Sequence, residues 1–543
     1  MSNPNTIFFE GFTTDFTTDF TQVGVNLDPS YWLKPSGVGS IGQHPRLDPA
    51  GWGDGSTDTK FNMYKLSPHD HTDLAGNNRV YTGQGIIALT GFPQTFSQIT
   101  TNDDGTNVRG IGIGFYINKL ASEPSGTLAP NFAQRLLKIY NNNSFNYSSD
   151  FANTSGVIEI DVIHSTGAPS GYSDTISVSD SRNLSLRVRT PDAAGTAWVE
   201  KYFDTNVLGS TWNYLQPASD SNYTRTDQRI ISTFKENSAS DKVAGTATFN
   251  GDDYYNGLFV ELSILPTGTA ANSATNSHYE MQIRLNGMNL YERGKTQDDQ
   301  TVVGLEGKYF HTATSNVFFD RIDWYGSRTG VARFDTADTS GPNTKVLNDS
   351  TWIDDIYIIA NTGLTSASIT HADNFLGSST KVFALFPDTT GINQSGSWRQ
   401  FSADDGYADI NNTDVKQYLQ DDDGDNTYVY AENNNNALMF NFDNITIDAA
   451  LNINNYVIGG IKITNSSRAV STGVQFQNVF APSGDLPLTN DYDVSGIGQQ
   501  FSVTGTVYRY QNQYLMENSL HTPAKKWTPT EINNGHFGIV KRS

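Results

Sequence analysis

The sequence contains no cysteine and few cations, and both shortages limit what kind of protein it can be. Without cysteine among its 543 residues, the chain has neither a disulfide framework nor a thiolate metal site. Lysine and arginine number 35 against 57 aspartates and glutamates, so the formal net charge is −22. Nucleic-acid binding depends on basic patches that neutralise phosphates. The composition therefore argues against nucleic acid as a partner.

Long apolar runs are also missing. No stretch of about 18 apolar residues occurs, so we expect no membrane-spanning helix and no membrane partner. The first residues, Met1-Ser2-Asn3-Pro4-Asn5, have neither the basic nor the apolar region of a signal peptide. We therefore expect a protein that is made in a cytoplasm and either stays there or is released by lysis.

The chain does contain many short alternating segments separated by turns. Aromatic residues make up 12% of it, too many for a disordered chain, and 48 glycines mark turns. Two alternating runs flank Asn286-Gly287, a pair typical of a tight hairpin. Long segments with helical periodicity do not occur. The sequence therefore predicts an all-β protein with antiparallel β-sandwich, jelly-roll-like domains and only short helices.

A chain of this length exceeds one hydrophobic core, and a turn after residue 360 suggests the division. We expect a first domain over residues 1–360, with long insertions, and a second β-sandwich over residues 361–543. The second domain begins its strands at 381–387 in this interpretation. It ends with a short helix, in which Thr528 is the N-cap and Glu531 reaches back to it, followed by a strand.

The strands before residue 360 form a recognisable series: 259–265, 279–291, 317–326 and 351–359. In this order they resemble the second half of a concanavalin A-like (laminin-G-like) jelly roll, which implies two packed sheets. Their apolar character places Trp324, Trp352, Tyr357 and Ile358 in the core. Upstream, Ile111-Gly112-Ile113-Gly114-Phe115 alternates with glycine, which indicates a strand against which something packs closely.

One strand carries a candidate catalytic motif with Glu159, Asp161 and His164. It resembles the Glu-x-Asp-x-(x)-Glu strand of family-16 glycoside hydrolases, in which the first Glu is the nucleophile, the Asp tunes it and the last Glu is the acid/base. Here a histidine stands in the last position. Retaining hydrolysis needs two facing carboxyl groups. We therefore expect no enzymatic activity, with a glycoside hydrolase or a lectin on this fold as the alternative.

Other residues are candidates for ligand or metal binding. If a glycan binds, Glu159 and Asp161 lie on the relevant sheet face, and Trp32, Trp52 and Tyr254 could provide stacking surfaces. Aspartates alternate at Asp421, Asp423 and Asp425, so their carboxylates could converge on Ca²⁺, a cation that prefers oxygen ligands. A solvated acidic turn is the alternative interpretation of this cluster.

Three segments suggest a biological setting. Ile-Asp-Asp-Ile-Tyr at 353–357, Phe-Leu-Gly at 375–377 with Val382 and Pro387, and Trp-Thr-x-x-Glu-Ile-Asn at 527–533 follow one another. In this order they resemble structural proteins of tailed bacteriophages. The resemblance implies a virion protein, either a capsid decoration or a tail or baseplate appendage. Such a protein would be assembled in the host cytoplasm, present as a homo-oligomer or in many copies, and bound to other virion proteins, with host-surface glycans as a further candidate partner.

Overall fold

The structure, a computed structural model, describes part of the chain in two compact units: the described residues up to Val382 belong to the first, and those from Phe383 onward belong to the second. The described residues are 6–12, 32–33, 39–45, 60–66, 86–90, 98–99, 111–118, 132–141, 158–166, 182–191, 198–204, 257–266, 279–285, 287–292, 303–305, 317–325, 331–332, 345–346, 351–360, 370–377, 380–383, 385, 387–393, 398–410, 419, 426–445, 457–469, 473–482, 496–503 and 509–543. Strands in antiparallel sheets dominate them, which confirms the all-β prediction.

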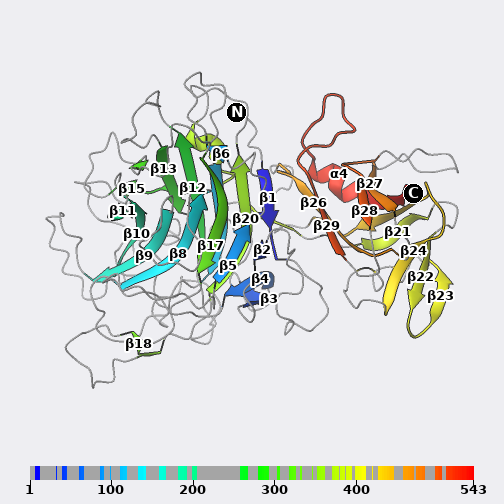
Figure 1. The fold of residues 1–543 in the computed structure, drawn as a ribbon, viewed down its shortest axis with the longest axis horizontal. Helices are drawn as coiled ribbons and strands as arrows, with labels where there is room; N and C mark the ends of the chain where they lie inside the picture. Colours follow the sequence, from blue (N-terminus) through cyan, green and yellow to red (C-terminus); the bar gives the residue numbers. More distant parts are fainter. Residues whose placement is uncertain are drawn as a thin grey trace, which may run out of the picture. The chain divides into compact units, whose positions relative to one another are not determined.

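Two nine-stranded antiparallel sheets make up most of the described part of the first unit (Figure 1). Sheet A contains β1 (Thr6–Glu10), β3 (Gly39–Pro45), β4 (Lys60–Leu66), β7 (Ile111–Asn118), β12 (Gly257–Pro266), β13 (Tyr279–Leu285), β14 (Met288–Asn289), β16 (Val303–Leu305) and β20 (Thr351–Ala360). Sheet B contains β2 (Trp32–Leu33), β5 (Ile86–Thr90), β6 (Gln98–Ile99), β8 (Phe132–Asn141), β9 (Ile158–Thr166), β10 (Arg182–Pro191), β11 (Trp198–Asp204), β15 (Tyr291–Glu292) and β17 (Val317–Tyr325). A separate ribbon pairs β18 (Val331–Ala332) with β19 (Lys345–Val346).

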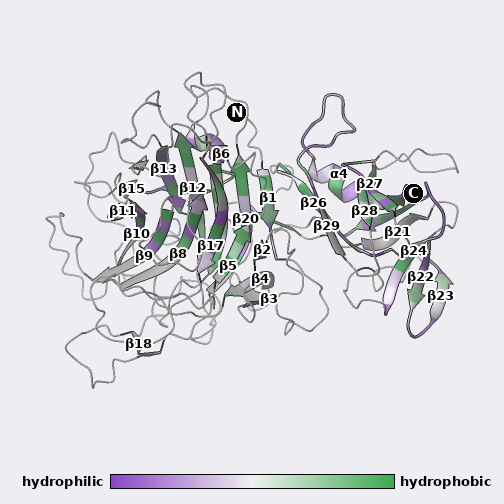
Figure 2. Ribbon diagram, viewed as in Figure 1, coloured by the Kyte–Doolittle hydropathy of each residue, from purple (hydrophilic) through white to green (hydrophobic). Residues whose placement is uncertain are grey.

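Aromatic side chains from both sheets meet in the core of this unit. Phe115 of sheet A lies edge-on to Trp324 of sheet B, with 5.9 Å between ring centroids, and Trp32 lies 6.0 Å from Trp324. Trp324, Tyr357 and Ile358 are buried as predicted, whereas the side chain of Trp352 is outside the described residues. Figure 2 shows hydrophobic positions interrupted by hydrophilic ones along β12 and β17. This alternation gives each sheet an apolar inner face and a more polar outer face.

The glycines of β7 allow close packing on the outer face of sheet A, as the sequence predicted. A Cβ at Gly112 would overlap the backbone carbonyl of Asn374, and one at Gly114 would overlap the ring of Tyr357. Around them Tyr116, Phe259, Tyr357 and Ile359 form a buried apolar cluster, against which Leu376 packs. The outer face of sheet A is therefore covered by chain that follows β20.

The covering segment, residues 370–382, is named the strap. It contains the 3₁₀ helix η2 (His371–Asn374) and belongs to the first unit. The division between the units therefore lies after Val382 and not after residue 360, because the strap makes its contacts with sheet A. The strand predicted at 381–387 is also corrected: β21 spans Pro387–Asn393, and Lys381 and Val382 instead contact aspartates of β20.

The second unit contains three antiparallel sheets. The first has the order β21, β25 (Ala437–Phe442), β30 (His536–Lys541), β27 (Val474–Ala481) and β28 (Phe501–Val503). The second has the order β23 (Gly406–Asp409), β22 (Trp398–Ser402) and β24 (Thr427–Ala431), and the third pairs β26 (Ile461–Ser467) with β29 (Arg509–Leu515). Trp398 of the three-stranded sheet packs with Leu438 and Phe440 of the five-stranded one, so these two sheets share a core.

The end of the chain completes this unit. Helix α4 (Pro529–Asn534) has the predicted capping box, in which Glu531 accepts from the Thr528 amide and the Thr528 hydroxyl accepts from the Glu531 amide. Burial acts to raise the pKa of Glu531, but hydrogen bonds from His521, Thr528 and Asn518 outweigh it and hold the pKa below its usual value. The strand that follows, β30, pairs with β25 on one side and β27 on the other. β30 is therefore the central strand of the five-stranded sheet.

A methyl group on β7 should test the close packing. Gly114→Ala should destabilise the first unit by about 1–3 kcal/mol, because the tyrosine ring cannot yield without moving the strap. Thermal unfolding of the full chain measures the loss. The control is Val457→Ala at a side chain that is 75% exposed, which should change stability by less than about 0.5 kcal/mol. An unchanged melting temperature for Gly114→Ala would contradict the packing described for this face.

Candidate functional site

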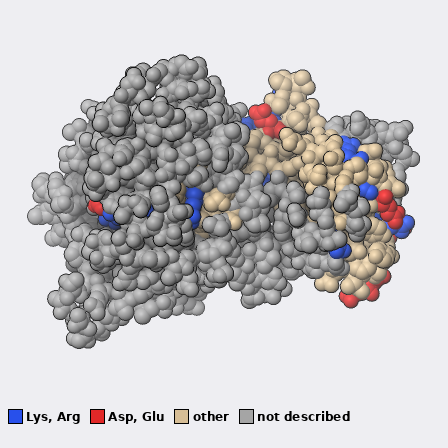
Figure 3. Space-filling model, in the orientation of Figure 1, with Lys and Arg blue, Asp and Glu red and all other residues tan. Residues whose placement is uncertain are grey.

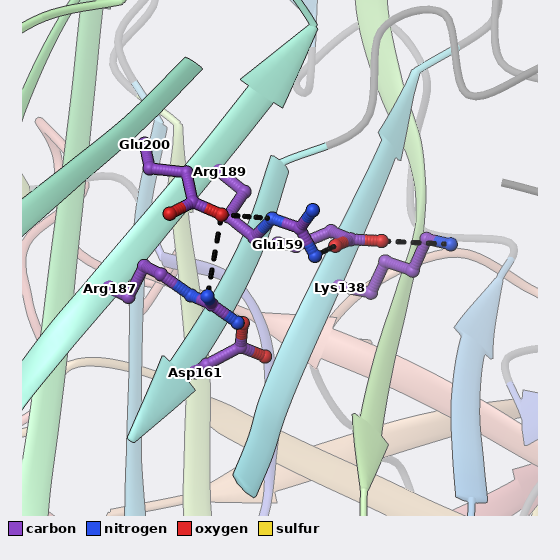
Figure 4. Close-up of polar contacts among 6 residues, drawn as sticks. All are labelled: Lys138, Glu159, Asp161, Arg187, Arg189 and Glu200. Carbon is purple, nitrogen blue, oxygen red and sulfur yellow. Dashed lines mark hydrogen bonds and ion pairs between the residues drawn. The ribbon is translucent and has the colours of Figure 1, made fainter. Parts of the chain in front are cut away.

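Six charged side chains, named the charge ladder, lie on the outer face of sheet B (Figure 4). Its first part runs across four strands. Lys138 of β8 contacts Glu159 of β9 at 3.3 Å, and Glu159 contacts Arg189 of β10 at 3.6 Å. Arg189 then meets Glu200 of β11 at 3.1 Å. Glu159 therefore lies between two cations, and the charges alternate in sign across the sheet.

The second part of the charge ladder returns toward β9. Glu200 also contacts Arg187 at 3.3 Å, and Arg187 donates from Nε and Nη2 to one oxygen of Asp161, at 3.2 and 2.7 Å. Figure 4 shows Arg187 between the two carboxylates. Three cations balance three anions, so the charge ladder as a whole is neutral.

Strand register brings these residues together. Glu159 lies directly opposite Lys138 on one side and Arg189 on the other, and Asp161 lies opposite Arg187. Glu200 lies opposite Arg189. Residues that face each other across an antiparallel pair have neighbouring Cβ atoms, so opposite charges at these positions attract. The intervening apolar residues of β9, Ile158 and Ile160, are fully buried in the core.

The polar face continues onto β17 through an aromatic ring. Arg321 binds both carboxylate oxygens of Asp323, at 2.6 and 3.0 Å. Lys138 and Arg321 each lie over the ring of Tyr140, at 5.2 and 5.1 Å from its centroid. Burial raises the pKa of Asp323, although the Arg321 guanidinium opposes that shift. Burial and the nearby Asp323 raise the pKa of Tyr140 well above its ordinary value.

This arrangement is poorly suited to hydrolytic chemistry. Glu159 and Asp161 are 0% and 2% exposed, and each is held by cations. His164, the third residue of the motif, lies on the same strand, opposite Leu184 of β10.

A second polar cluster holds the strap on the outer face of sheet A. The carboxylate of Glu261, fully buried, accepts from the Tyr357 hydroxyl at 2.6 Å and from the Gly377 amide at 2.7 Å. The Tyr357 hydroxyl in turn accepts from the Leu376 amide at 3.1 Å. Burial raises the pKa of Glu261, and the hydrogen bonds from Tyr357 and Gly377 oppose that shift. The pair thus fixes two strap amides to the sheet.

Further contacts fix both ends of the strap. At one end Ser263 accepts from the Asn374 side chain at 2.9 Å and lies 2.9 Å from Nδ1 of His371. All three side chains are buried, so this hydroxyl–imidazole pair is not an accessible nucleophile. In the middle, the guanidinium of Arg284 lies 4.1 Å from the centroid of the Phe375 ring.

At the other end, two buried aspartates of β20 receive the strap. Lys381 contacts Asp354 at 2.9 Å and Asp355 at 3.2 Å, and the Val382 amide donates to Asp355 at 2.7 Å. The register of β20 against β7 shifts at these aspartates, and Asp355 has a positive φ of 48°. This bulge turns consecutive carboxylates toward the strap, where a regular strand would direct one of them into the core.

The remaining candidates from the sequence are not assembled into one site. Trp32 is only 3% exposed and contacts Phe8, Phe12 and Trp324, so its ring is part of the core and offers no face for a sugar. Trp52, Tyr254 and the aspartates Asp421, Asp423 and Asp425 lie outside the described residues. Within the described ranges, no group of three His, Cys, Asp or Glu side chains could hold a metal ion. Nor does any helix there have the length and apolarity to cross a membrane.

The sequence interpretation missed the partners of the acidic residues. Arg187 and Arg189 alternate with apolar residues in Leu-Arg-Val-Arg, and Glu200 follows Trp-Val on the next strand. That pattern indicates a charged outer face. Which acidic residue pairs with which arginine depends on the register between the strands. Lys381 and Glu261 gave no comparable signal, because their partners are distant in sequence.

Comparisons with known proteins add little. No family model matches the chain, and no curated protein matches it. Among solved structures, it is similar to the "Crystal structure of botulinum neurotoxin serotype D binding domain" at 10% identity, with 92% of this chain and 97% of that chain covered and a TM-score of 0.18. A TM-score this low supports no argument about fold or function.

Removing one member of a buried pair should show that the charge ladder is structural. Asp161→Asn leaves Arg187 with a weakened partner in a buried position, and we expect a loss of about 3–5 kcal/mol. The control is Asp409→Asn, the same change in a pair with Arg399 in which the aspartate side chain is 85% exposed. There the loss should stay below about 1 kcal/mol. Chemical denaturation of the full chain measures both, and equal losses would contradict the argument.

The buried Glu261 should make the strap sensitive to pH. Because its pKa in the folded protein is raised above 4.5, its contribution to stability is fully present below pH 4.5 and is lost as the pH rises through the raised value. Glu261→Gln should abolish that component, so its melting temperature should fall less than that of the wild type between pH 4.5 and 8. Glu432→Gln, at a half-exposed carboxylate, is the control. Parallel pH profiles for the wild type and Glu261→Gln would refute the assignment.

Proposed function

We propose that this protein is a non-enzymatic structural component of a tailed-bacteriophage virion, either a capsid decoration or a tail or baseplate appendage. The observation that carries the proposal is that residues of the segments that resemble phage structural proteins hold the fold together. Asp354 binds Lys381 of the strap, and Asp355 accepts from the Val382 amide. Tyr357 accepts from the Leu376 amide, and Glu261 accepts from the Gly377 amide. These residues make intramolecular contacts that stabilise a scaffold.

The C-terminal segment serves the same purpose. Trp527 is 1% exposed and packs against Phe480 and Phe537, and its indole donates to the Leu515 carbonyl at 3.2 Å. Asn533 accepts from the Ile445 amide at 2.8 Å. A virion protein must stay folded after lysis in dilute, variable surroundings, and such contacts suit that demand. The net charge of −22 also helps to keep a protein present in many copies soluble.

A glycoside hydrolase or lectin on a concanavalin A-like fold is the second candidate. Glu159 and Asp161 favour it by sequence, but in the charge ladder both are buried and paired with cations. Retaining hydrolysis would require Glu159 to attack a sugar while a further carboxylic acid, at the last position of the motif, donates a proton. Lys138 and Arg189 oppose the attack by holding the Glu159 carboxylate in place.

Localisation on particles tests the proposal. Phage particles induced from the source organism would be banded in a density gradient and labelled with antibodies against the purified chain. We expect the protein to band with the particles in many copies and the label to decorate a fixed place on them. Its absence from washed, infectious particles would refute a structural role.

An activity assay tests the alternative. The full chain would be incubated with bacterial surface polysaccharides and assayed for new reducing ends, with Glu159→Gln as the matched variant. We expect no reducing ends from either protein. Turnover by the wild type that disappears in Glu159→Gln would establish the glycosidase in place of the scaffold.

A further inference from the structure

The three-stranded sheet of the second unit has an aromatic outer face. Strand register places Phe401 of β22 opposite Tyr407 of β23 on one side and Tyr428 of β24 on the other. The centroid of the Phe401 ring lies 4.8 Å from that of Tyr407 and 4.9 Å from that of Tyr428. Tyr430 lies 5.7 Å from Tyr407 and 6.1 Å from Tyr428. The opposite face of the sheet carries Trp398 into the core. The four rings are therefore on the side directed away from that core.

The most exposed of these rings is held in place by its neighbours. Tyr407 is 69% exposed, although two other rings contact it. Large apolar side chains are usually covered, and exposed aromatic groups with a polar tip are common at binding surfaces. A ring that is both exposed and supported loses little side-chain entropy on binding. Its position therefore suits contact with a ligand.

Charged groups lie directly beside the rings. Arg399 contacts Asp409 at 3.0 Å and Glu432 at 3.1 Å, and these side chains are 39%, 85% and 44% exposed. Every outward position that the register defines on β22, β23 and β24 is aromatic or charged: Arg399, Phe401, Tyr407, Asp409, Tyr428 and Tyr430. The face thus combines flat apolar surfaces with an array of hydrogen-bond donors and acceptors, and it has no outward aliphatic side chain.

The charge of this region restricts the ligand. Asp404 and Asp405, both exposed, lie in the turn between β22 and β23, and Figure 3 shows acidic side chains at that end of the unit. With Asp409 and Glu432 they outnumber Arg399, so the region repels polyanions. Two copies of the same acidic face would also repel each other. A neutral ligand meets neither obstacle.

We propose that the outer face of the β23-β22-β24 sheet binds a neutral glycan. A pyranose ring has an apolar C–H face and polar edges, and both match this surface. The C–H face packs on Tyr407, while the hydroxyl groups exchange hydrogen bonds with Arg399, Asp409 and Glu432. This site is separate from the charge ladder, and it goes beyond the proposed virion role without depending on it.

Affinity electrophoresis of the full chain tests the site. Native gels would contain dextran, a soluble mixed-linkage β-glucan or yeast mannan as the neutral probe. We expect at least one polysaccharide to retard the wild type. Tyr407→Ala should weaken that binding roughly tenfold, because truncating a central aromatic contact removes much of the binding free energy. Tyr407→Phe keeps the ring and should retain most of the binding, and Val457→Ala should behave as the wild type.

Companion measurements make the result decisive. Tyr407→Ala should still unfold cooperatively, with a melting temperature only a few degrees below that of the wild type, because the side chain is mostly exposed and only its contacts with Phe401 and Tyr430 are lost. Asp409→Asn provides a second variant that should also weaken binding. Retardation by none of the three polysaccharides, or equal retardation of Tyr407→Ala and the wild type, would overturn the proposal. Sedimentation velocity tests whether a second copy of the chain binds this face instead. Self-association that Tyr407→Ala abolishes would assign the face to that second copy and overturn the glycan proposal. The particle-localisation experiment is independent of all these outcomes.

Discussion

Burial of carboxylates is the constraint on which the first unit depends. Glu159, Asp161, Glu261, Asp323, Asp354 and Asp355 are all at most 2% exposed. An isolated charge removed from water is strongly destabilising unless cations or hydrogen-bond donors replace the solvent. In a chain with 35 lysines and arginines against 57 acidic residues, Lys138, Arg187, Arg189, Arg321 and Lys381 are committed to this task.

The same constraint explains how the two sheets of this unit differ. The outer face of sheet B pairs its charges laterally, strand to strand, so the charge ladder is satisfied within the sheet itself. On the outer face of sheet A, the buried carboxylates of Glu261, Asp354 and Asp355 instead accept from strap amides and from Lys381. The strap is consequently part of the first unit, and the glycines of β7 leave the space in which it lies.

The second unit relies more on aromatic packing than on buried charge. Phe480, Trp527 and Phe537 form one apolar cluster beneath α4, and β30 joins the strands on either side of it. Because the last strand is central in its sheet, this unit can be completed only when the end of the chain is in place. The outer face of the three-stranded sheet differs from this pattern, since its rings gather where solvent reaches them.

Local features of this protein were determined by the sequence alone. The apolar strand pattern placed Trp324 in the core, Asn286-Gly287 marked the hairpin between β13 and β14, and Thr528 with Glu531 began the last helix. The physical reason is short range, because side-chain period, turn conformation and capping involve residues a few positions apart.

Tertiary structure alone decided the partners of the charged residues and the position of the division between the units. Tyr357 meets Glu261, 96 residues away, and Lys381 meets Asp354, 27 residues away. The strand register places Arg187 opposite Asp161. Trp32, a candidate binding surface by sequence, packs against Trp324 in the core. Such contacts depend on which strands become neighbours and how far each is shifted, and a shift of one residue would exchange the two faces of a sheet. Composition and periodicity are the same for every such arrangement, so only the folded chain distinguishes them.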